Sequence, residues 1–464
     1  MPVGNRSEAG LTIPATYLVA YALPLLLGAP FALLPPQRTW WLPARLALAF
    51  ALGALLLAVE STAMTLVGMP WNPLVPLLIS AVPTAILLRR KSRTARSVAT
   101  RPGLAGGAVL AGALVLAFAH LALSIGIARA TSPDFLLFWG PKAVRFAAAR
   151  AVDPGLLAWP YFRHAQPFYP PLTPVVDAWA VLATGHMPWR TAPVTTLLWW
   201  GATVVLVLEI LRRRLGDRPA AMITGFWGLA LGSSLVASFS AGIAEAPLLL
   251  YTTAGASLLL AERERPARGE RFLAGLFLAG AVFTKVEGSV VSILLIGGVA
   301  WRDYLTEGRM AGRRLLPLAL PPLCAGLLWI AFLARFDIPI GYLGRGSLLA
   351  FPGNPVVVVR AMAASLGAGV YGISWIFPLL VLLATRRRAP RRGALPATVC
   401  ILGLFVFLAA VYVHEPRDPR QRIRWEVPRV SQTALSVLIL AAGLVSFARS
   451  TNVGREDPVV LAGG

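Results

Sequence analysis

Isolated charged residues at the borders of apolar segments are the groups in this sequence that could do chemistry. Asp134 follows the apolar run 104–128, Glu245 lies at the start of another apolar run, and Glu287 lies between two more. A carboxylate near hydrocarbon is costly, so each of these is a candidate functional group. Asp134 would stand where a rigid helix meets a long loop, which suits a general base that needs fixed geometry and access to a polar substrate. A carboxylate that caps the following helix is the structural alternative.

Lysine usage adds a second group of candidates. The chain has three lysines, Lys91, Lys142 and Lys285, and every other basic residue except histidine is arginine. The compact lysine ammonium binds phosphate as a point charge, and Lys142 and Lys285 fall in the candidate site. Chance placement is the alternative. Within Thr-Lys-Val-Glu-Gly, an ion pair between Lys285 and Glu287 could close a broken helix, or the tip could present charged groups and backbone groups to a ligand.

Four further polar residues belong to the same predicted face of the protein. Arg163 and His164 precede a Tyr-Pro-Pro element that begins at Tyr169, and each proline biases the residue before it away from helix. A structural turn is the alternative to a ligand role there. Arg429 ends the late segment Arg-Trp-Glu-Val-Pro-Arg, in which Trp425 and Arg429 are alternatively interfacial anchors.

The composition places these residues in a membrane. Of 464 residues, 57% are hydrophobic and 14% are charged, which excludes an ordinary soluble enzyme. The 43 basic residues outnumber the 20 acidic ones, but they fall in short clusters between apolar runs, as the positive-inside rule describes for cytoplasmic loops. We therefore predict contact with membrane lipids and no nucleic-acid partner. Cys324 and Cys400 are the only cysteines, so they predict neither a disulfide framework nor a metal site.

The apolar runs predict an all-α polytopic membrane protein of about 11–13 transmembrane helices, with surface helices in a long exterior loop at 129–168. Phe135, Phe138, Ala143 and Phe146 would line one face of a helix on the membrane surface. The expected spans lie near 13–35, 44–68, 71–88, 104–128, 191–211, 219–238, 241–261, 315–335, 362–385, 393–413 and 430–448.

Two segments are expected not to form simple spans. The runs 272–284 and 288–301 are each short for a crossing, so they predict a hairpin or broken helix whose tip, residues 285–288, lies toward the exterior. The apolar segment 169–185 is also short, and we expect it to be re-entrant or partly surface-lying. Exterior loops would follow at 336–355 and 414–428.

The order of these features resembles a known family. Asp134 is followed by a W-x-x-K-A element, a YPPL element, an acidic residue at a later span, a TK-x-EG element and a late W-x-V-P segment, at residues 139–143, 169–172, 245, 284–288 and 425–428. In this order they resemble polytopic glycosyltransferases of the C-type membrane fold, which include protein O-mannosyltransferases and lipid A aminoarabinose transferases. The resemblance covers residues 104–448. It leaves 1–103 as N-terminal transmembrane helices without a counterpart and 449–464 as a cytoplasmic tail.

The resemblance implies an enzyme that moves a sugar from a polyprenyl-phosphate donor to a hydroxyl of a lipid, glycan or protein acceptor, with inversion at the anomeric carbon. The reaction would take place on the exterior, periplasmic face of a bacterial inner (plasma) membrane. Asp134 would be the catalytic base. The donor phosphate would be bound by Lys142, Arg163, Lys285 or Arg429. Substrate would be bound by His164, Tyr169, Glu245 and Glu287.

Two departures from the family pattern bear on metal dependence. Many relatives have an adjacent acidic pair where this loop has Asp134 alone, and Thr433 stands where an arginine is expected, with Arg429 as a possible substitute. Without an acidic pair or a histidine cluster, we predict an enzyme that needs neither a metal nor another cofactor.

Two other classes of protein stay open. In a transporter or lipid flippase the same charged groups would line a path, but a transporter should show related halves and charges near mid-membrane. A non-catalytic subunit of an envelope assembly is the third possibility.

Overall fold

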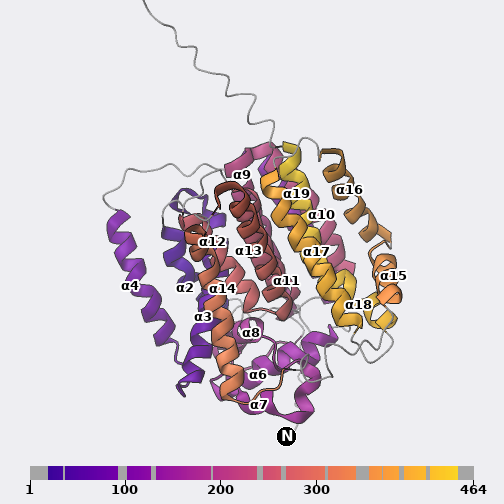
Figure 1. Cartoon of the computed structure of the whole chain (residues 1–464). Coiled ribbons are helices and arrows are strands. Elements are labelled where there is room, and N and C mark those ends of the chain that lie inside the picture. The colour runs from indigo at the N-terminus through magenta and orange to yellow at the C-terminus, as the bar shows by residue number, and fades with distance from the viewer. Residues whose placement is uncertain are drawn as a thin grey trace, which may run out of the picture.

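The computed structural model describes most of the chain as helices packed side by side (Figure 1). The described residues are 19–34, 37–91, 102–126, 132–189, 192–237, 244–262, 268–308, 312–340, 355–367, 369–385, 391–413 and 419–447. Within these ranges there is no β-strand. The expected tail at 449–464, the start of the first expected span, and the loop residues Glu415 and Asp418 lie outside the described residues.

The helices fall into two groups, those that coincide with the predicted spans and the predicted hairpin, and the remaining elements. The long or membrane-like helices are α2 (Ala22–Leu33), α3 (Leu42–Leu66), α4 (Leu74–Lys91), α5 (Leu104–Gly126), α9 (Thr195–Leu215), α10 (Asp217–Ala237), α11 (Glu245–Leu260), α12 (Arg268–Val282), α13 (Val286–Glu307), α14 (Gly312–Arg335), α16 (Gly369–Thr385), α17 (Arg391–Val413) and α19 (Gln432–Phe447). The shorter elements include the π-helix η2 (Phe135–Trp139), α6 (Gly140–Ala149), α7 (Pro154–Ala158), the 3-10 helix η3 (Pro160–Ala165), α8 (Leu172–Thr184), α15 (Pro355–Leu366) and α18 (Pro419–Val430).

Six helices among the described residues are long and apolar enough to cross a membrane. They comprise residues Leu42–Leu66, Leu104–Leu123, Thr195–Leu215, Val286–Thr306, Gly312–Arg335 and Ala394–Val413. The described residues are therefore all-helical apart from turns and loops, and the six helices indicate an integral membrane protein. The other crossings in the expected set of about 11–13 stay predictions, because most of those helices are shorter than the roughly 20 residues that span a bilayer directly.

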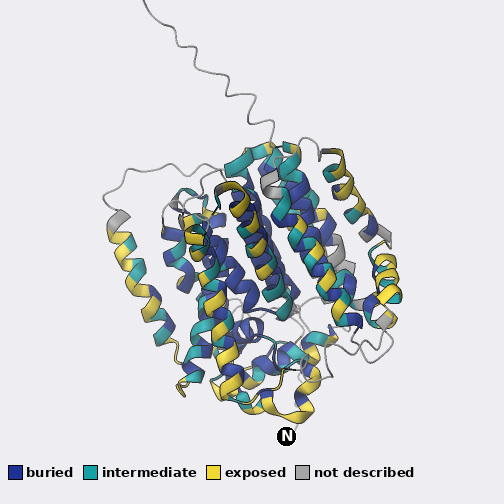
Figure 2. Cartoon of the chain, viewed as in Figure 1, coloured by how far each residue is buried: buried dark blue, intermediate teal, exposed yellow. Residues whose placement is uncertain are grey.

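The bundle has two chemically different ends. At one end, which we call the loop end, α6, α7 and α8 lie together, and α18 lies toward the same end beside α15 (Figure 1). At the other, which we call the basic end, arginines pair with acidic residues, as Arg214 does with Glu270 and Arg302 with Glu262. Figure 2 shows exposed residues along the outer helices α4 and α14, where apolar side chains would face lipid. In contrast, every residue of α11 is buried, so Glu245, which begins α11, is enclosed by neighbouring helices.

Three expectations about local structure were wrong. The second half of the predicted hairpin is not short: α13 continues to Glu307 and is long enough to span a membrane. The expected span 362–385 is divided between α15 and α16, and Gly367 and Gly369, both poor helix formers, lie at the break. The loop helix does not present its aromatic face to a membrane, because Phe135 and Phe146 are fully buried and α6 packs against α8.

The segment after the Tyr-Pro-Pro element forms α8, which has 13 residues. At 1.5 Å per residue this helix is about 20 Å long, short of the roughly 30 Å hydrocarbon core. It packs on α6 and α3 at the loop end, and Trp179 donates a hydrogen bond to Ser61 Oγ of α3 at 2.9 Å.

The N-terminal helices pack into the same core as the later ones. Tyr251 of α11 donates a hydrogen bond to the Ala51 carbonyl of α3 at 2.6 Å, and Phe50 packs on Trp199 of α9. The hydroxyl of Tyr21 donates to the buried carboxylate of Asp177 in α8. The described N-terminal helices α2 and α3 therefore support the helices that position the loop end.

Candidate functional site

A continuous series of ion pairs joins five of the predicted site residues at the loop end. Arg429 Nη1 is 2.5 Å from Asp134 Oδ2, and Arg429 Nε is 2.9 Å from Glu245 Oε1. Lys285 Nζ is 3.0 Å from the same Glu245 oxygen and 3.4 Å from Glu287 Oε1. We call these five residues the ionic chain. Residues 295 positions apart in the sequence, Asp134 and Arg429, are thus in direct contact.

Four different elements supply the ionic chain. Asp134 immediately precedes η2, Arg429 lies in the last turn of α18, and Lys285 lies between α12 and α13. Glu245 and Glu287 lie in the first turns of α11 and α13. Because the N-terminus of a helix carries partial positive charge, these two positions favour carboxylates.

The turn between α12 and α13 brings Lys285 close to Glu245. The backbone of Lys285 is extended, with φ −153° and ψ 160°, and α13 begins at the next residue. A Cβ at Gly288 would lie 1.9 Å from the Ala281 carbonyl oxygen, so only glycine allows the two helices to approach this closely. The Phe283 carbonyl accepts a hydrogen bond from the Leu172 amide at 3.1 Å, which ties this turn to α8.

The ionic chain has an open end and a closed end. The side chains of Asp134 and Arg429 are 24% and 25% exposed, whereas those of Glu245 and Lys285 are 6% and 5% exposed. The carboxylates of Glu245 and Asp134 raise the pKa of Arg429 above its usual value, so the guanidinium stays charged. A polar ligand that approaches from solvent would therefore meet Asp134 and Arg429 first.

An aromatic column lies beside the closed end. Lys285 Nζ is 5.5 Å from the centre of the Tyr169 ring, and Tyr169 stacks on Trp139 with ring centres 6.1 Å apart. Lys142 Nζ lies 5.1 Å from the Trp139 ring and donates to the Gln166 carbonyl at 2.8 Å. Such contacts between cations and rings stabilise the cations where water is excluded.

Lys142 is enclosed rather than presented to solvent. Lys142 is 1% exposed, and burial lowers the pKa of its ammonium to about 7. The predicted role of Lys142 in phosphate binding stays a prediction, and its surroundings favour a role in fixing the Trp139 ring and the Gln166 carbonyl.

Two predicted site residues lie apart from the ionic chain. Arg163 and His164 are exposed on η3, and His164 Nδ1 is 3.0 Å from the Tyr161 carbonyl oxygen. The His164 ring packs near Phe138, with ring centres 6.0 Å apart. No ion pair joins either residue to the ionic chain within the ranges that the structure covers.

The structure also tests two structural interpretations of these residues, helix capping by Asp134 and an ion pair between Lys285 and Glu287. Asp134 precedes η2 but makes no side-chain capping hydrogen bond, so the capping interpretation is wrong. Lys285 and Glu287 do form the ion pair that would close a helix break, and this pair is one link of the longer ionic chain.

Sequence reasoning missed two sets of polar contacts. Beside Arg429 on α18, Arg422 donates to Glu426 Oε1 at 2.8 Å, and Tyr412 donates to Glu426 Oε2 at 3.4 Å. At the basic end, four buried residues form a charge-balanced cluster: Glu262, Arg271, Arg302 and Asp303. The signal was the pair Arg302-Asp303, which interrupts the end of an otherwise apolar run.

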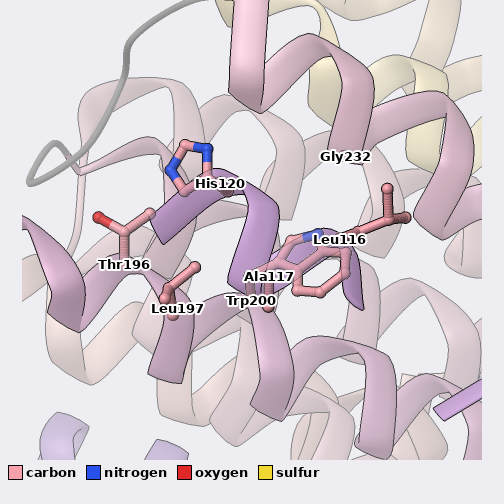
Figure 3. Close-up of a pocket in the computed structure, with 7 residues that line it drawn as sticks. All are labelled: Leu116, Ala117, His120, Thr196, Leu197, Trp200 and Gly232. Atoms are coloured by element: carbon pink, nitrogen blue, oxygen red, sulfur yellow. The ribbon is translucent and has the colours of Figure 1, made fainter. Parts of the chain in front are cut away.

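The described residues show no metal cluster at the site, and the pocket that they form lies elsewhere. In the part of the chain that the structure describes, no group of three or more His, Cys, Asp or Glu side chains is placed to hold a metal ion. Figure 3 shows a shallow apolar pocket between α5, α9 and α10, with an empty volume of about 250 Å³, near His120, Thr196 and Trp200. Its lining carries no carboxylate, lysine or arginine, so it offers no acid–base chemistry comparable to that of the ionic chain.

Comparison of the chain with protein families, with curated proteins and with solved structures finds no significant match.

Proposed function

We propose that this protein is a membrane glycosyltransferase that transfers a sugar from a polyprenyl-phosphate donor to an acceptor hydroxyl. The observation that carries the proposal is the contact of Asp134, Arg429, Glu245 and Lys285 at one end of a membrane bundle. A general base and cations for an anionic leaving group are the groups that such a transfer requires.

The proposed reaction uses the open end of the ionic chain. Asp134 takes the proton of the acceptor hydroxyl. The acceptor oxygen attacks the anomeric carbon on the face opposite the phosphate. The bond between that carbon and the phosphate oxygen breaks, its electron pair stays on the phosphate, and the anomeric configuration inverts. Arg429, assisted by Lys285 beneath it, stabilises the developing phosphate charge, while Glu245 holds both cations in position.

The two ends of the bundle suggest an orientation. At the basic end α9 finishes with Arg212, Arg213 and Arg214, and the positive-inside rule assigns such a cluster to the cytoplasm. The loop end would then face the exterior, the periplasm in a bacterial inner membrane. A polyprenyl tail would remain in the bilayer against exposed apolar side chains while its phosphate reaches Arg429.

The position of the charges distinguishes this proposal from a transporter. Glu245 begins α11 and Lys285 precedes α13, so the ionic chain lies at helix ends, whereas transporter sites gather near the membrane midplane. A lipid flippase and a non-catalytic envelope subunit are kept as outcomes of the test below.

The test supplies purified protein with radiolabelled polyprenyl-phosphate sugars and a panel of lipid, glycan and peptide acceptors. We expect label on an acceptor and release of polyprenyl phosphate with the native protein. Asp134→Asn should lower the rate about 10²–10⁴-fold, the usual contribution of a general base.

Asp153→Asn is the matched control, because Asp153 pairs with Arg145 at 2.9 Å, apart from the ionic chain, and asparagine can keep its helix-capping bond to the Leu156 amide. Equal transfer by the native protein and Asp134→Asn would remove Asp134 from catalysis. Movement of labelled lipid between leaflets without transfer would support a flippase, and neither activity would support a structural subunit.

A further inference from the structure

The charge balance of the ionic chain limits how an anion can bind there. Its three carboxylates, Asp134, Glu245 and Glu287, outnumber its two cations, Arg429 and Lys285. Each cation already contacts two carboxylates. A phosphate added to this arrangement would increase the excess negative charge in a largely buried site, which is unfavourable. An anionic ligand must therefore replace a carboxylate at one of the cations.

The contacts indicate which carboxylate is replaced. Glu245 contacts both cations and its side chain is 6% exposed, so separating it from them would leave buried charges unpaired. Among the described residues Asp134 is ion-paired with Arg429 alone, and its side chain is 24% exposed. Water can solvate Asp134 after it separates from Arg429, so this exchange costs least.

The geometry of Arg429 favours the same exchange. Nη1 of Arg429 donates a hydrogen bond to Asp134, whose side chain is partly exposed. The Nε contact with Glu245 is close at 2.9 Å, but its N–H makes no hydrogen bond. A phosphate with several acceptor oxygens could take the Nη1 donor while Glu245 keeps the guanidinium in place.

We propose that the phosphodiester group of the lipid-linked sugar donor displaces Asp134 from Arg429, and that Asp134 becomes available as a base only while this headgroup is bound. This inference rests on the proposed function. Without a headgroup, Arg429 holds Asp134 in an ion pair, so this carboxylate oxygen is occupied and cannot contact an acceptor hydroxyl. The exchange breaks one ion pair and forms another, with no covalent change. It would couple the activation of the acceptor to the presence of the donor.

A binding measurement tests this exchange without any sugar transfer. The dissociation constant of tritiated farnesyl phosphate is measured for the purified full-length protein in detergent. Asp134→Asn should bind farnesyl phosphate about fivefold more tightly, because asparagine has a similar size but carries no charge that competes for Arg429. A fivefold change corresponds to about 1 kcal/mol, which is the contribution of a partly exposed ion pair. Arg429→Gln should bind at least about tenfold more weakly. Asp153→Asn, in which the altered carboxylate pairs with Arg145, should bind as the native protein does.

Competition experiments identify which part of the ligand is recognised. Inorganic phosphate should compete with farnesyl phosphate and farnesol should not; competition by farnesol with equal potency would overturn the proposal. Equal or weaker binding by a folded Asp134→Asn, as judged by its thermal unfolding, would overturn the exchange and leave the proposed enzyme intact. Absence of farnesyl phosphate binding to the native protein would overturn the donor class and the exchange together.

Discussion

Removal of the Lys285 ammonium should be among the most damaging changes to the site. Lys285 is the only cation within ion-pair distance of Glu287 in the described structure, and it is one of two that contact Glu245. Lys285→Met changes the ionic chain from two cations and three carboxylates to one cation and three. The side chains of Lys285, Glu245 and Glu287 are 12% exposed or less. We therefore expect Lys285→Met to lower the free energy of unfolding by about 3–5 kcal/mol.

A second substitution isolates the charge effect of Lys285→Met. Adding Glu287→Gln restores the original excess of one negative charge, so the double variant should recover about 1–2 kcal/mol relative to Lys285→Met. Arg145→Met is the exposed control: Arg145 pairs with Asp153, but its side chain is 60% exposed, and its loss should cost less than about 1 kcal/mol.

The assay is reversible unfolding in mixed micelles with increasing denaturing detergent, followed by circular dichroism and tryptophan fluorescence. The reasoning would be refuted if Lys285→Met cost no more than Arg145→Met. It would also be refuted if Glu287→Gln destabilised Lys285→Met further, because the excess negative charge would then not be the cause.

Three other changes test separate parts of the structure. Burial lowers the pKa of Lys142 to about 7 from the ordinary value of 10.5, so the unfolded chain binds more protons than the folded one between these pH values. The free energy of unfolding, measured at pH 7 and pH 9, should therefore rise by up to about 1.4 kcal/mol per pH unit. Lys142→Met should lack that rise. A rise of the same size in Lys142→Met would contradict this. Gly288→Ala should cost at least about 1–3 kcal/mol in the same unfolding assay because its Cβ would meet the backbone of α12, whereas Gly297→Ala on the same helix has open space and should be tolerated. Equal effects of the two alanines would remove the close-approach argument. Arg271→Met should cost about 3–5 kcal/mol by opening the buried cluster at the basic end, yet leave farnesyl phosphate affinity unchanged; a change in affinity would show that the two ends are coupled.

The sequence could indicate which residues belong to the site, but not how they pair. Glu245 and Lys285 stand alone in apolar sequence, and a charge in that position requires a partner, so both could be singled out. The partner of Asp134 lies 295 residues away, and nothing local in either segment specifies that contact. It depends on how α18 packs, and α18 itself falls largely in a region that we expected to be a loop.

Helix length was predicted least well where charges are neutralised by tertiary contacts. The second half of the α12–α13 hairpin was assigned as short because Arg302 and Asp303 end the apolar run. In the structure α13 continues through both residues, since Glu262 and Arg271 pair with them in the buried cluster. Hydropathy along one segment carries no information about such partners from neighbouring helices.

The most direct test of the account is a structure of the full-length protein in lipid nanodiscs with farnesyl phosphate bound, determined by electron cryomicroscopy. We expect the phosphate within hydrogen-bonding distance of Arg429, with Asp134 turned away from the guanidinium and Glu245 still in contact with it. A phosphate bound elsewhere, for example at the arginines of the basic end, while Asp134 and Arg429 remain paired, would contradict the claim that the ionic chain receives the donor.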